Sequence, residues 1–255
     1  MVAAVAFAGS VVATAIASET GGPHRAGNHA AHGGARAVTR STAAAAGSAT
    51  QTVPVASGWT LLATPHGSIP RYAAPGVAPD GEVPAQWLSA TSTLPVVAQV
   101  PGWLEVRLPQ APNETTAWVR RPDVDLTTTP YRIVVHLAST ELELLDAGQT
   151  VFTAPVGIGT TQYPTVTGHF FVALLAEPPS PGYGPFVMVT SAHSATITDW
   201  EDSGDALVAI HGPLDADAAI GTSGARVSHG CIRMHDTDLA HLRNVPAGTP
   251  VDIEV

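Results

Sequence analysis

The sequence predicts a mainly β protein with two consecutive β-rich segments and little helix. Short apolar runs recur along the chain with Gly and Pro turns between them, as in proteins built from closely spaced strands. Within residues 102–108, GWLEVRL, apolar and charged residues alternate with the period of a half-buried strand. A polar stretch, TTTP at residues 127–130, interrupts these runs. We therefore expect a boundary there between the two segments.

Composition limits the classes of function. The chain has 255 residues, a formal net charge of −10 and only 11 Lys and Arg residues, which argues against a nucleic-acid partner. Its single cysteine excludes an intrachain disulfide framework and a multi-cysteine metal cage. We predict no cofactor and no metal. A lone thiol in an exported protein can oxidise, so its presence favours a reactive role.

Residues 1–20 are predicted to be a signal peptide or a membrane anchor. The first 18 residues carry no charge and end in small residues, although a basic leader is missing. Their Ala, Gly and Ser make the run only weakly apolar, so a cleaved signal is favoured over a retained anchor. We expect the protein to be exported to a bacterial cell envelope, outside the cytoplasmic membrane.

Residues 21–57 are predicted to be a disordered linker. They are mostly Gly, Ala, His, Ser and Thr, and such a segment buries too little apolar surface to offset its ordering entropy. The histidines His24, His29 and His32 are interpreted as scattered polar residues rather than metal ligands. The linker would act as a flexible tether.

Residues 58–127 are predicted to form a small β-barrel, because strand-like runs follow one another without helical periods. The runs lie at residues 58–63, 69–72, 94–100, 102–108 and 117–120. The strand at 102–108, followed by Thr116-Ala117-Trp118-Val119, resembles bacterial SH3-like domains, with Ala117 in place of their glycine. We interpret Trp103 and Trp118 as core residues rather than the walls of a ligand groove.

Residues 130–255 are predicted to form a second β-sheet domain. Strand-like runs lie at residues 131–137, 141–145, 150–157, 168–175, 186–190, 206–210 and 251–255, with Ala147-Gly148 as a hairpin turn. The Pro- and Gly-rich residues 177–185 are expected to form a stiff loop. One helix is expected over residues 237–243, with Asp236 as its N-cap and Pro246 and Gly248 beyond its end.

The stretch Ser228-His229-Gly230-Cys231-Ile232-Arg233-Met234 holds the only cysteine beside an imidazole and a guanidinium. A thiol has a reference pKa of about 8.5 and needs a base or cationic partner to act as a nucleophile near neutral pH. His211 directly follows a strand-like run, so a rigid element would position it as the base. The amides of Gly230 and Cys231 are candidate oxyanion donors, and the carbonyl of Gly212 is the nearest group to orient the imidazole.

Each of these residues also has a non-catalytic interpretation. A lone cysteine is often buried and inert. His229, Cys231 and His235 would make a zinc site with His211, but a His-x-Cys pair on a glycine turn is a poor chelate. In a non-catalytic interpretation of its own, Arg233 would only pair with Asp236 or Asp238.

The pair His211-Gly212 and the stretch 228–234 resemble the signature of the L,D-transpeptidase (YkuD-type) catalytic domain. Further matches flank this signature at residues 131–135, 155–159, 163–170 and 248–251. The resemblance implies a β-sandwich-like domain with one or two short helices over residues 130–255, after an SH3-like domain.

Carried over by position, the resemblance implies that Cys231 is the nucleophile and His211 the general base. It also implies that the Gly212 carbonyl orients the base and that His229 shapes the site. Arg233 and Ser228 would contact substrate. Val166, Phe186 and Met188 depart from the family pattern, which bears on substrate preference.

The implied reaction is a cysteine acyl transfer on peptidoglycan stem peptides, which serve as donor and acceptor, to give 3→3 cross-links. Carbapenems would inhibit it through the same thiol. Two alternatives stay open at this point: an L,D-carboxypeptidase that trims stem peptides, and a non-catalytic cell-wall-binding protein.

Overall fold

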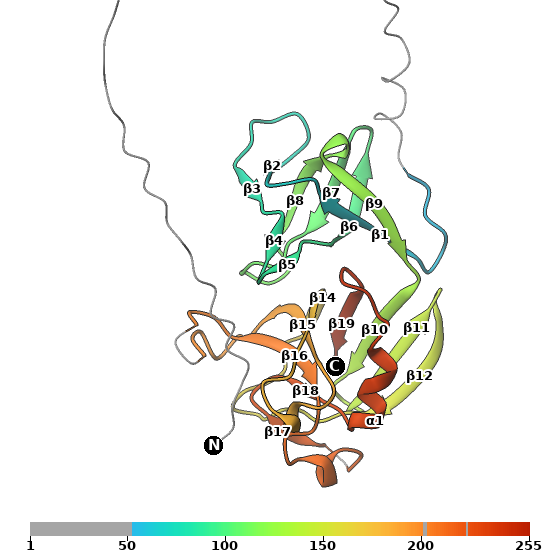
Figure 1. Ribbon diagram of the computed structural model, residues 1–255, viewed down its shortest axis with the longest axis vertical. Helices are drawn as coiled ribbons and strands as arrows, with labels where there is room; N and C mark the ends of the chain where they lie inside the picture. Colours follow the sequence, from blue (N-terminus) through green and yellow to red (C-terminus); the bar gives the residue numbers. More distant parts are fainter. Residues whose placement is uncertain (1–52, 201–202, 223) are drawn as a thin grey trace, which may run out of the picture.

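The computed structural model describes residues 53–200, 203–222 and 224–255. They form two β units stacked one above the other (Figure 1), which we call the N-terminal unit, residues 53–129, and the C-terminal unit, residues 130–255. The predicted signal or anchor and most of the predicted linker lie outside the described residues. Within the described ranges, no helix is long and apolar enough to cross a membrane.

The N-terminal unit contains a five-stranded sheet in the order β8-β7-β6-β1-β9. Its strands are β1 (Thr60–Pro65), β6 (Leu94–Val100), β7 (Trp103–Arg107), β8 (Thr116–Arg120) and β9 (Val124–Thr129), with η1 (Arg121–Asp123) before the last. Two small hairpins, β2 (Ile69–Arg71) with β3 (Gly81–Val83) and β4 (Gln86–Trp87) with β5 (Ala90–Thr91), lie between β1 and β6. The likeness to SH3-like domains stays a prediction.

Alternation places one face of this sheet in a core. Leu104 and Val106 of β7, together with Val119 of β8, are buried, while their neighbours in sequence are not. Trp103 and Trp118 are only half-buried, so their placement in the core was wrong. Both belong to the alternate positions that face away from the core.

Residues 127–130, where the boundary between the segments is expected, do not form a separate connector. Thr127 to Thr129 continue β9 and pair with β1, for example Thr129 with Thr60. The chain therefore leaves the first sheet directly and enters the second at Tyr131. Polar, β-branched threonines fit an edge strand that is partly exposed.

The C-terminal unit contains an eight-stranded sheet in the order β12-β11-β10-β19-β14-β15-β16-β18. The strands are β10 (Tyr131–His136), β11 (Glu141–Asp146), β12 (Gln149–Pro155), β14 (Gly168–Ala176), β15 (Val187–His193), β16 (Leu207–His211), β18 (Ile232–Arg233) and β19 (Pro250–Glu254). β13 (Ile158–Gly159) pairs separately with β17 (Arg226–Ser228), and η2 (Pro181–Tyr183) and η3 (Asp217–Ala219) lie in loops. The fold is mainly β, as predicted.

Two local features of this sheet follow from the sequence. Ala147 and Gly148 have φ of 48° and 82° between β11 and β12, the two left-handed residues of a tight hairpin turn, as predicted. β19, the last strand in sequence, lies between β10 and β14 and pairs parallel to the first of these. It therefore joins the β10–β12 half of the sheet to the β14–β18 half.

The predicted helix is shorter than expected. α1 spans Asp236–Leu239 and continues as the 3-10 turn η4 (Ala240–Leu242). The N-cap position is His235 rather than Asp236, and no side chain caps the first turn. Leu239 and Leu242 are both fully buried. Their spacing of three residues suits a 3-10 turn, whose side chains repeat every three positions.

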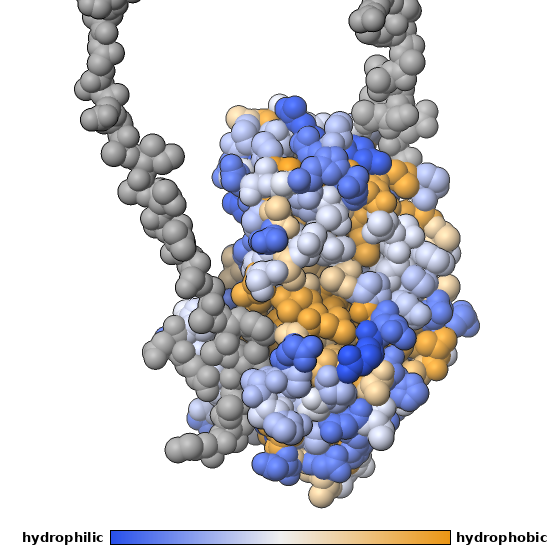
Figure 2. Space-filling view, viewed as in Figure 1, coloured by the Kyte–Doolittle hydropathy of each residue, from blue (hydrophilic) through white to orange (hydrophobic). Residues whose placement is uncertain are grey.

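The two units share a core. Phe171 and Ala173 project from β14 into the cluster of the N-terminal unit, which includes Leu104 and Val106. Polar contacts add to this: the Asn113 side chain accepts a hydrogen bond from the His193 amide at 2.8 Å and donates one to the His193 carbonyl at 2.9 Å. Figure 2 shows an apolar area where the units meet. The junction is therefore packed and hydrogen-bonded rather than a loose contact.

We expect Phe171→Ala to lower the free energy of unfolding by about 3–5 kcal/mol, because it removes a fully buried ring and leaves a cavity. Val151→Ala is the control, since Val151 is 57% exposed on β12, and should change it by less than about 0.5 kcal/mol. Equilibrium denaturation with guanidinium measures both. An equal, small effect of the two substitutions would contradict a shared core.

Candidate active site

His211 ends β16, and Cys231 directly precedes the neighbouring strand β18; both line one cavity. β16 and β18 pair in parallel, with Ile210 opposite Ile232 and His211 opposite Arg233. Because side chains alternate along a strand, the two isoleucines enter the main core on one face. Cys231 is the neighbour of Ile232 in sequence, so its side chain takes the alternate direction. It packs on the other face with a second apolar cluster that includes Ala209. The strand pairing thus places the core residues and the candidate catalytic residues on opposite faces of the sheet.

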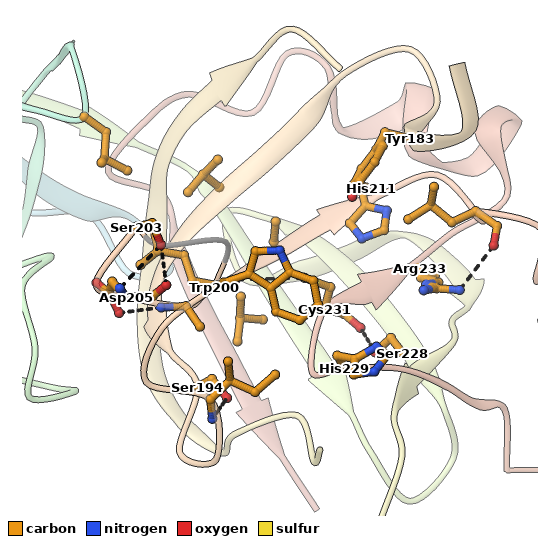
Figure 3. A pocket seen from close by; sticks show the side chains of 18 of the residues that line it. Tyr183, Ser194, Trp200, Ser203, Asp205, His211, Ser228, His229, Cys231 and Arg233 are labelled. Carbon is orange, nitrogen blue, oxygen red and sulfur yellow. Dashed lines mark hydrogen bonds between the residues drawn. The ribbon is translucent and has the colours of Figure 1, made fainter. Parts of the chain in front are cut away.

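A cavity of about 270 Å³ lies on that face (Figure 3). It is lined by predicted site residues and by others that the sequence analysis did not single out. The predicted ones are His211, Ser228, His229, Cys231 and Arg233. The others include Trp87, Leu88, Tyr183, Val189, Trp200, Asp205 and Leu207. The structure therefore brings five of the predicted residues around one hollow, with an apolar floor from β15 and β16.

The imidazole of His211 is held by its neighbour in sequence. Nδ1 lies 2.8 Å from the carbonyl oxygen of Gly212. A carbonyl only accepts, so Nδ1 carries the proton and Nε2 keeps its lone pair. Burial lowers the pKa of His211 from 6.5 to about 4; the Gly212 carbonyl opposes this and the charge of Arg233 adds to it. The ring is therefore neutral at pH 7 and able to accept a proton.

The thiol of Cys231 is half-buried against β16 and donates to the Leu207 carbonyl across 3.9 Å. Burial raises the pKa of Cys231, although the Ala209 backbone and Arg233 act in the opposite direction. At neutral pH the resting sulfur is therefore protonated. We expected a base or cationic partner to hold the Cys231 sulfur as a thiolate. The thiol is protonated instead, because desolvation outweighs the nearby positive charge.

Two side chains hold the loop before Cys231, one from the loop itself and one from a distant part of the chain. Ser228 Oγ donates to the Cys231 carbonyl at 2.5 Å and accepts from the Gly230 amide at 3.1 Å. Thr165 Oγ1 donates to the Gly230 carbonyl at 2.8 Å and accepts from the Gly159 amide at 2.9 Å. The Gly230 amide, a predicted oxyanion donor, is thus engaged within the loop, and the predicted substrate contact Ser228 serves the same turn.

His229 lies at the mouth of the cavity with two aromatic rings. Its ring is exposed and lies 4.7 Å from that of Tyr163 and 5.7 Å from that of Trp200, centre to centre. A second, wider hollow of about 560 Å³ opens on the other side of His229 and Trp200. His229 and Trp200 therefore separate the two hollows.

The zinc reading does not match the geometry. His235 does not line the cavity; its Nδ1 lies 2.7 Å from Asp217 Oδ1 instead. Across the described ranges, no three His, Cys, Asp or Glu side chains are grouped so that they could hold a metal ion.

Arg233 is buried beneath the cavity rather than paired with a carboxylate of the helix. Its Nη1 donates to the carbonyls of Pro213 at 3.4 Å and Leu214 at 3.3 Å. Its Nε is buried without a hydrogen-bond partner among the described residues. Among the described residues, no ion pair joins Arg233 to Asp236 or Asp238. Arg233 also lines the cavity.

Sequence reasoning missed Trp87, Trp200, Thr165 and Tyr183. Trp200 stands among turn-forming polar residues, where a large aromatic side chain is unexpected unless it has a contact to make, and that signal was available. Trp87 gave no such signal, because it reaches the cavity only through the packing of one unit on the other.

Comparison with known proteins supplies independent information. The family model described as the L,D-transpeptidase catalytic domain, YkuD, matches residues 130–253. A relative named as an L,D-transpeptidase YkuD from Bacillus licheniformis is 35% identical over 136 residues, 53% of this chain and 70% of its own. The corresponding protein of Bacillus subtilis is 31% identical over 127 residues, 49% of this chain and 67% of its own.

A solved L,D-transpeptidase in complex with imipenem is also similar. It is 19% identical, and the match covers 80% of this chain and 88% of that one with a TM-score of 0.38.

The buried imidazole makes stability depend on pH. Because the folded-state pKa of His211 is about 4 and that of a free histidine is 6.5, the unfolded chain binds the proton first as pH falls. Folding stability should therefore drop between pH 6.5 and pH 4, by up to about 3 kcal/mol from this group.

His211→Gln should remove that part of the pH dependence, whereas His229→Gln, at an exposed position, should keep it. Urea denaturation at pH 7 and pH 4 measures the difference. Identical losses in both variants would contradict the assignment.

Gly212→Ala is expected to displace the imidazole. A Cβ there would lie 2.6 Å from both Asp236 Oδ1 and the Gly184 amide nitrogen, and backbone cannot move aside cheaply. In Gly212→Ala, the rate at which iodoacetamide alkylates Cys231, followed by mass spectrometry, should no longer depend on His211. Gly67→Ala is the control for substitution alone, because a Cβ there would meet nothing within 4 Å and the residue is outside the left-handed region. Unchanged alkylation in Gly212→Ala would count against a requirement for this close packing.

Proposed function

Because the chain belongs to the family of L,D-transpeptidases with a YkuD catalytic domain, we propose that it cross-links peptidoglycan stem peptides through a thioester on Cys231. The observation that carries this proposal is the shared face of β16 and β18. It presents the thiol and an imidazole whose Nδ1 is held by the Gly212 carbonyl. Nucleophilic catalysis by a base-assisted thiol needs such an imidazole on the same side as the sulfur, within hydrogen-bond reach of it when substrate is bound.

In the first step, the Cys231 proton passes to His211 Nε2 as the sulfur attacks the carbonyl of the L-to-D bond between stem residues three and four. Because the resting thiol is protonated and the ring neutral, transfer accompanies attack rather than preceding it. The Cys231 amide is the oxyanion donor we propose; the Gly230 amide joins it only by exchanging its bond to Ser228. The C–N bond then breaks, and D-alanine leaves with the proton from His211.

In the second step, a side-chain amine of another stem attacks the thioester. His211 takes the proton of that amine, the C–S bond breaks, and the sulfur recovers a proton as the 3→3 peptide bond forms. If water attacks instead, the product is a shortened stem peptide, which is the L,D-carboxypeptidase alternative.

The remaining predicted residues have supporting roles in this proposal. Arg233 lines the cavity and its Nε has no hydrogen-bond partner among the described residues, so it is suited to attract a substrate carboxylate. His229, at the cavity mouth beside Tyr163, shapes the entrance. Ser228 acts on the substrate only through the loop that it closes.

We further propose that the protein acts outside the cytoplasmic membrane, where peptidoglycan lies, after export by residues 1–20. A half-buried thiol beside a base is also suited to open a β-lactam ring, so carbapenems are proposed inhibitors. The non-catalytic alternative, a wall-binding protein whose N-terminal unit does the work, would need neither the thiol nor the imidazole.

Cys231→Ala should abolish release of D-alanine and formation of cross-linked dimers from purified disaccharide tetrapeptides, because no other thiol exists in the chain. His211→Gln should lower kcat by about 10²–10⁴-fold, the usual contribution of a general base. Mass spectrometry of the products and of the intact protein measures turnover and the acyl adduct.

His241→Gln is the control, because that histidine stacks on Phe152 outside the cavity. Product from Cys231→Ala would end the thioester route. Hydrolysis without dimers in the unsubstituted protein would select the carboxypeptidase.

A further inference from the structure

We propose that the N-terminal unit completes the active site: Trp87 and Leu88 form a substrate-facing wall of the Cys231 cavity and limit the bulk of the acyl donor that fits beside the thiol. This inference rests on the proposed acyl transfer. The carrying observation is that both residues line the cavity together with Cys231 and His211, although they belong to the other unit.

The two residues lie at the tip of a very short hairpin. Trp87 pairs with Ala90, and Leu88 and Ser89 occupy the turn with φ of 48° and 65°. Left-handed conformations are unfavourable for residues other than Gly, Asn and Asp, so the turn needs support from its surroundings. A leucine is a poor choice for such a turn unless its side chain contributes packing.

That packing comes from the C-terminal unit. Trp87 contacts both the core of the N-terminal unit and the cluster of Tyr183, Val187, Val189 and Ala209. Leu88 contacts the second cluster, which Cys231 also touches. Both side chains stay only half-buried. Both also line the cavity with Cys231 and His211.

The wall is held in place by the rest of the junction. Phe171 of β14 is buried in the N-terminal core, and Asn113 bonds both backbone groups of His193. Glu114 Oε1 accepts from the His169 amide at 3.0 Å. A rigidly docked wall selects by size, because enlarging the cavity would require the whole unit to move.

The chemistry of the lining defines the ligand. Trp87, Leu88, Val189 and Leu207 are apolar, and the positively charged Arg233 also lines the cavity. The cavity therefore suits a peptide whose leaving residue, on the nitrogen side of the reacting bond, has a small apolar side chain and a carboxylate within reach of Arg233. A bulky side chain would collide with the indole of Trp87.

The test compares Trp87→Ala with Trp59→Ala, a control tryptophan of the same unit that is 40% exposed and lines a different hollow. Rates of Cys231 alkylation are measured with iodoacetamide and with its bulkier phenyl derivative. Trp87→Ala should raise the ratio of bulky to small reagent by about tenfold, and Trp59→Ala should leave it within twofold. With stem peptides, Trp87→Ala should raise KM for a D-alanine donor and improve turnover of a D-leucine donor.

Leu88→Ala serves as a second, milder variant if Trp87→Ala does not fold. Unchanged alkylation ratios in folded Trp87→Ala and Leu88→Ala would overturn the proposal. The alkylation assay does not need transpeptidation. If the unsubstituted protein labels at Cys231 but makes neither dimers nor trimmed peptides, the proposed function fails while the wall is still tested.

Discussion

The parallel pairing of β16 with β18 is the constraint on which the rest of the site depends. It sends Ile210 and Ile232 into the core, and leaves His211, Cys231 and Arg233 at the alternate positions. A shift of the pairing by one residue would bury the chemistry and expose the isoleucines, so the hydrophobic core itself enforces the register. The apolar core therefore keeps the proposed nucleophile and the proposed base at one cavity.

Burial then determines the charge state of the resting site. Desolvation moves the pKa of Cys231 upward and that of His211 downward, so both groups are neutral at pH 7. A neutral thiol is a poorer target for oxidants than a thiolate. This suits a lone cysteine in a protein proposed to work outside the cytoplasm. Reactivity would appear only when a carbonyl arrives and proton transfer can accompany attack.

Local patterns predicted much of this, and non-local contacts account for what was missed. Alternation and turn residues predicted most strands and the Ala147-Gly148 turn, because those signals act over a few residues. The motif around Cys231 and the pair His211-Gly212 located the cavity. The contribution of Trp87 depends on how two units pack, and the early end of α1 depends on burial of Leu239 and Leu242; neither is encoded in a short window. The same holds for Thr165, which acts on Gly230 from 65 positions away.

The central position of β19 has a consequence for biosynthesis. This strand pairs with β10, more than a hundred positions earlier, and with β14, so it closes the sheet between its two halves. Pairing at such sequence separation forms late, after a long loop has been closed. A nascent chain that still lacks β19 would have no strand between β10 and β14, so the two halves of the sheet would each expose an unpaired edge. The ribosome would therefore have to release residues 250–254 before the two halves of the sheet can close into one layer.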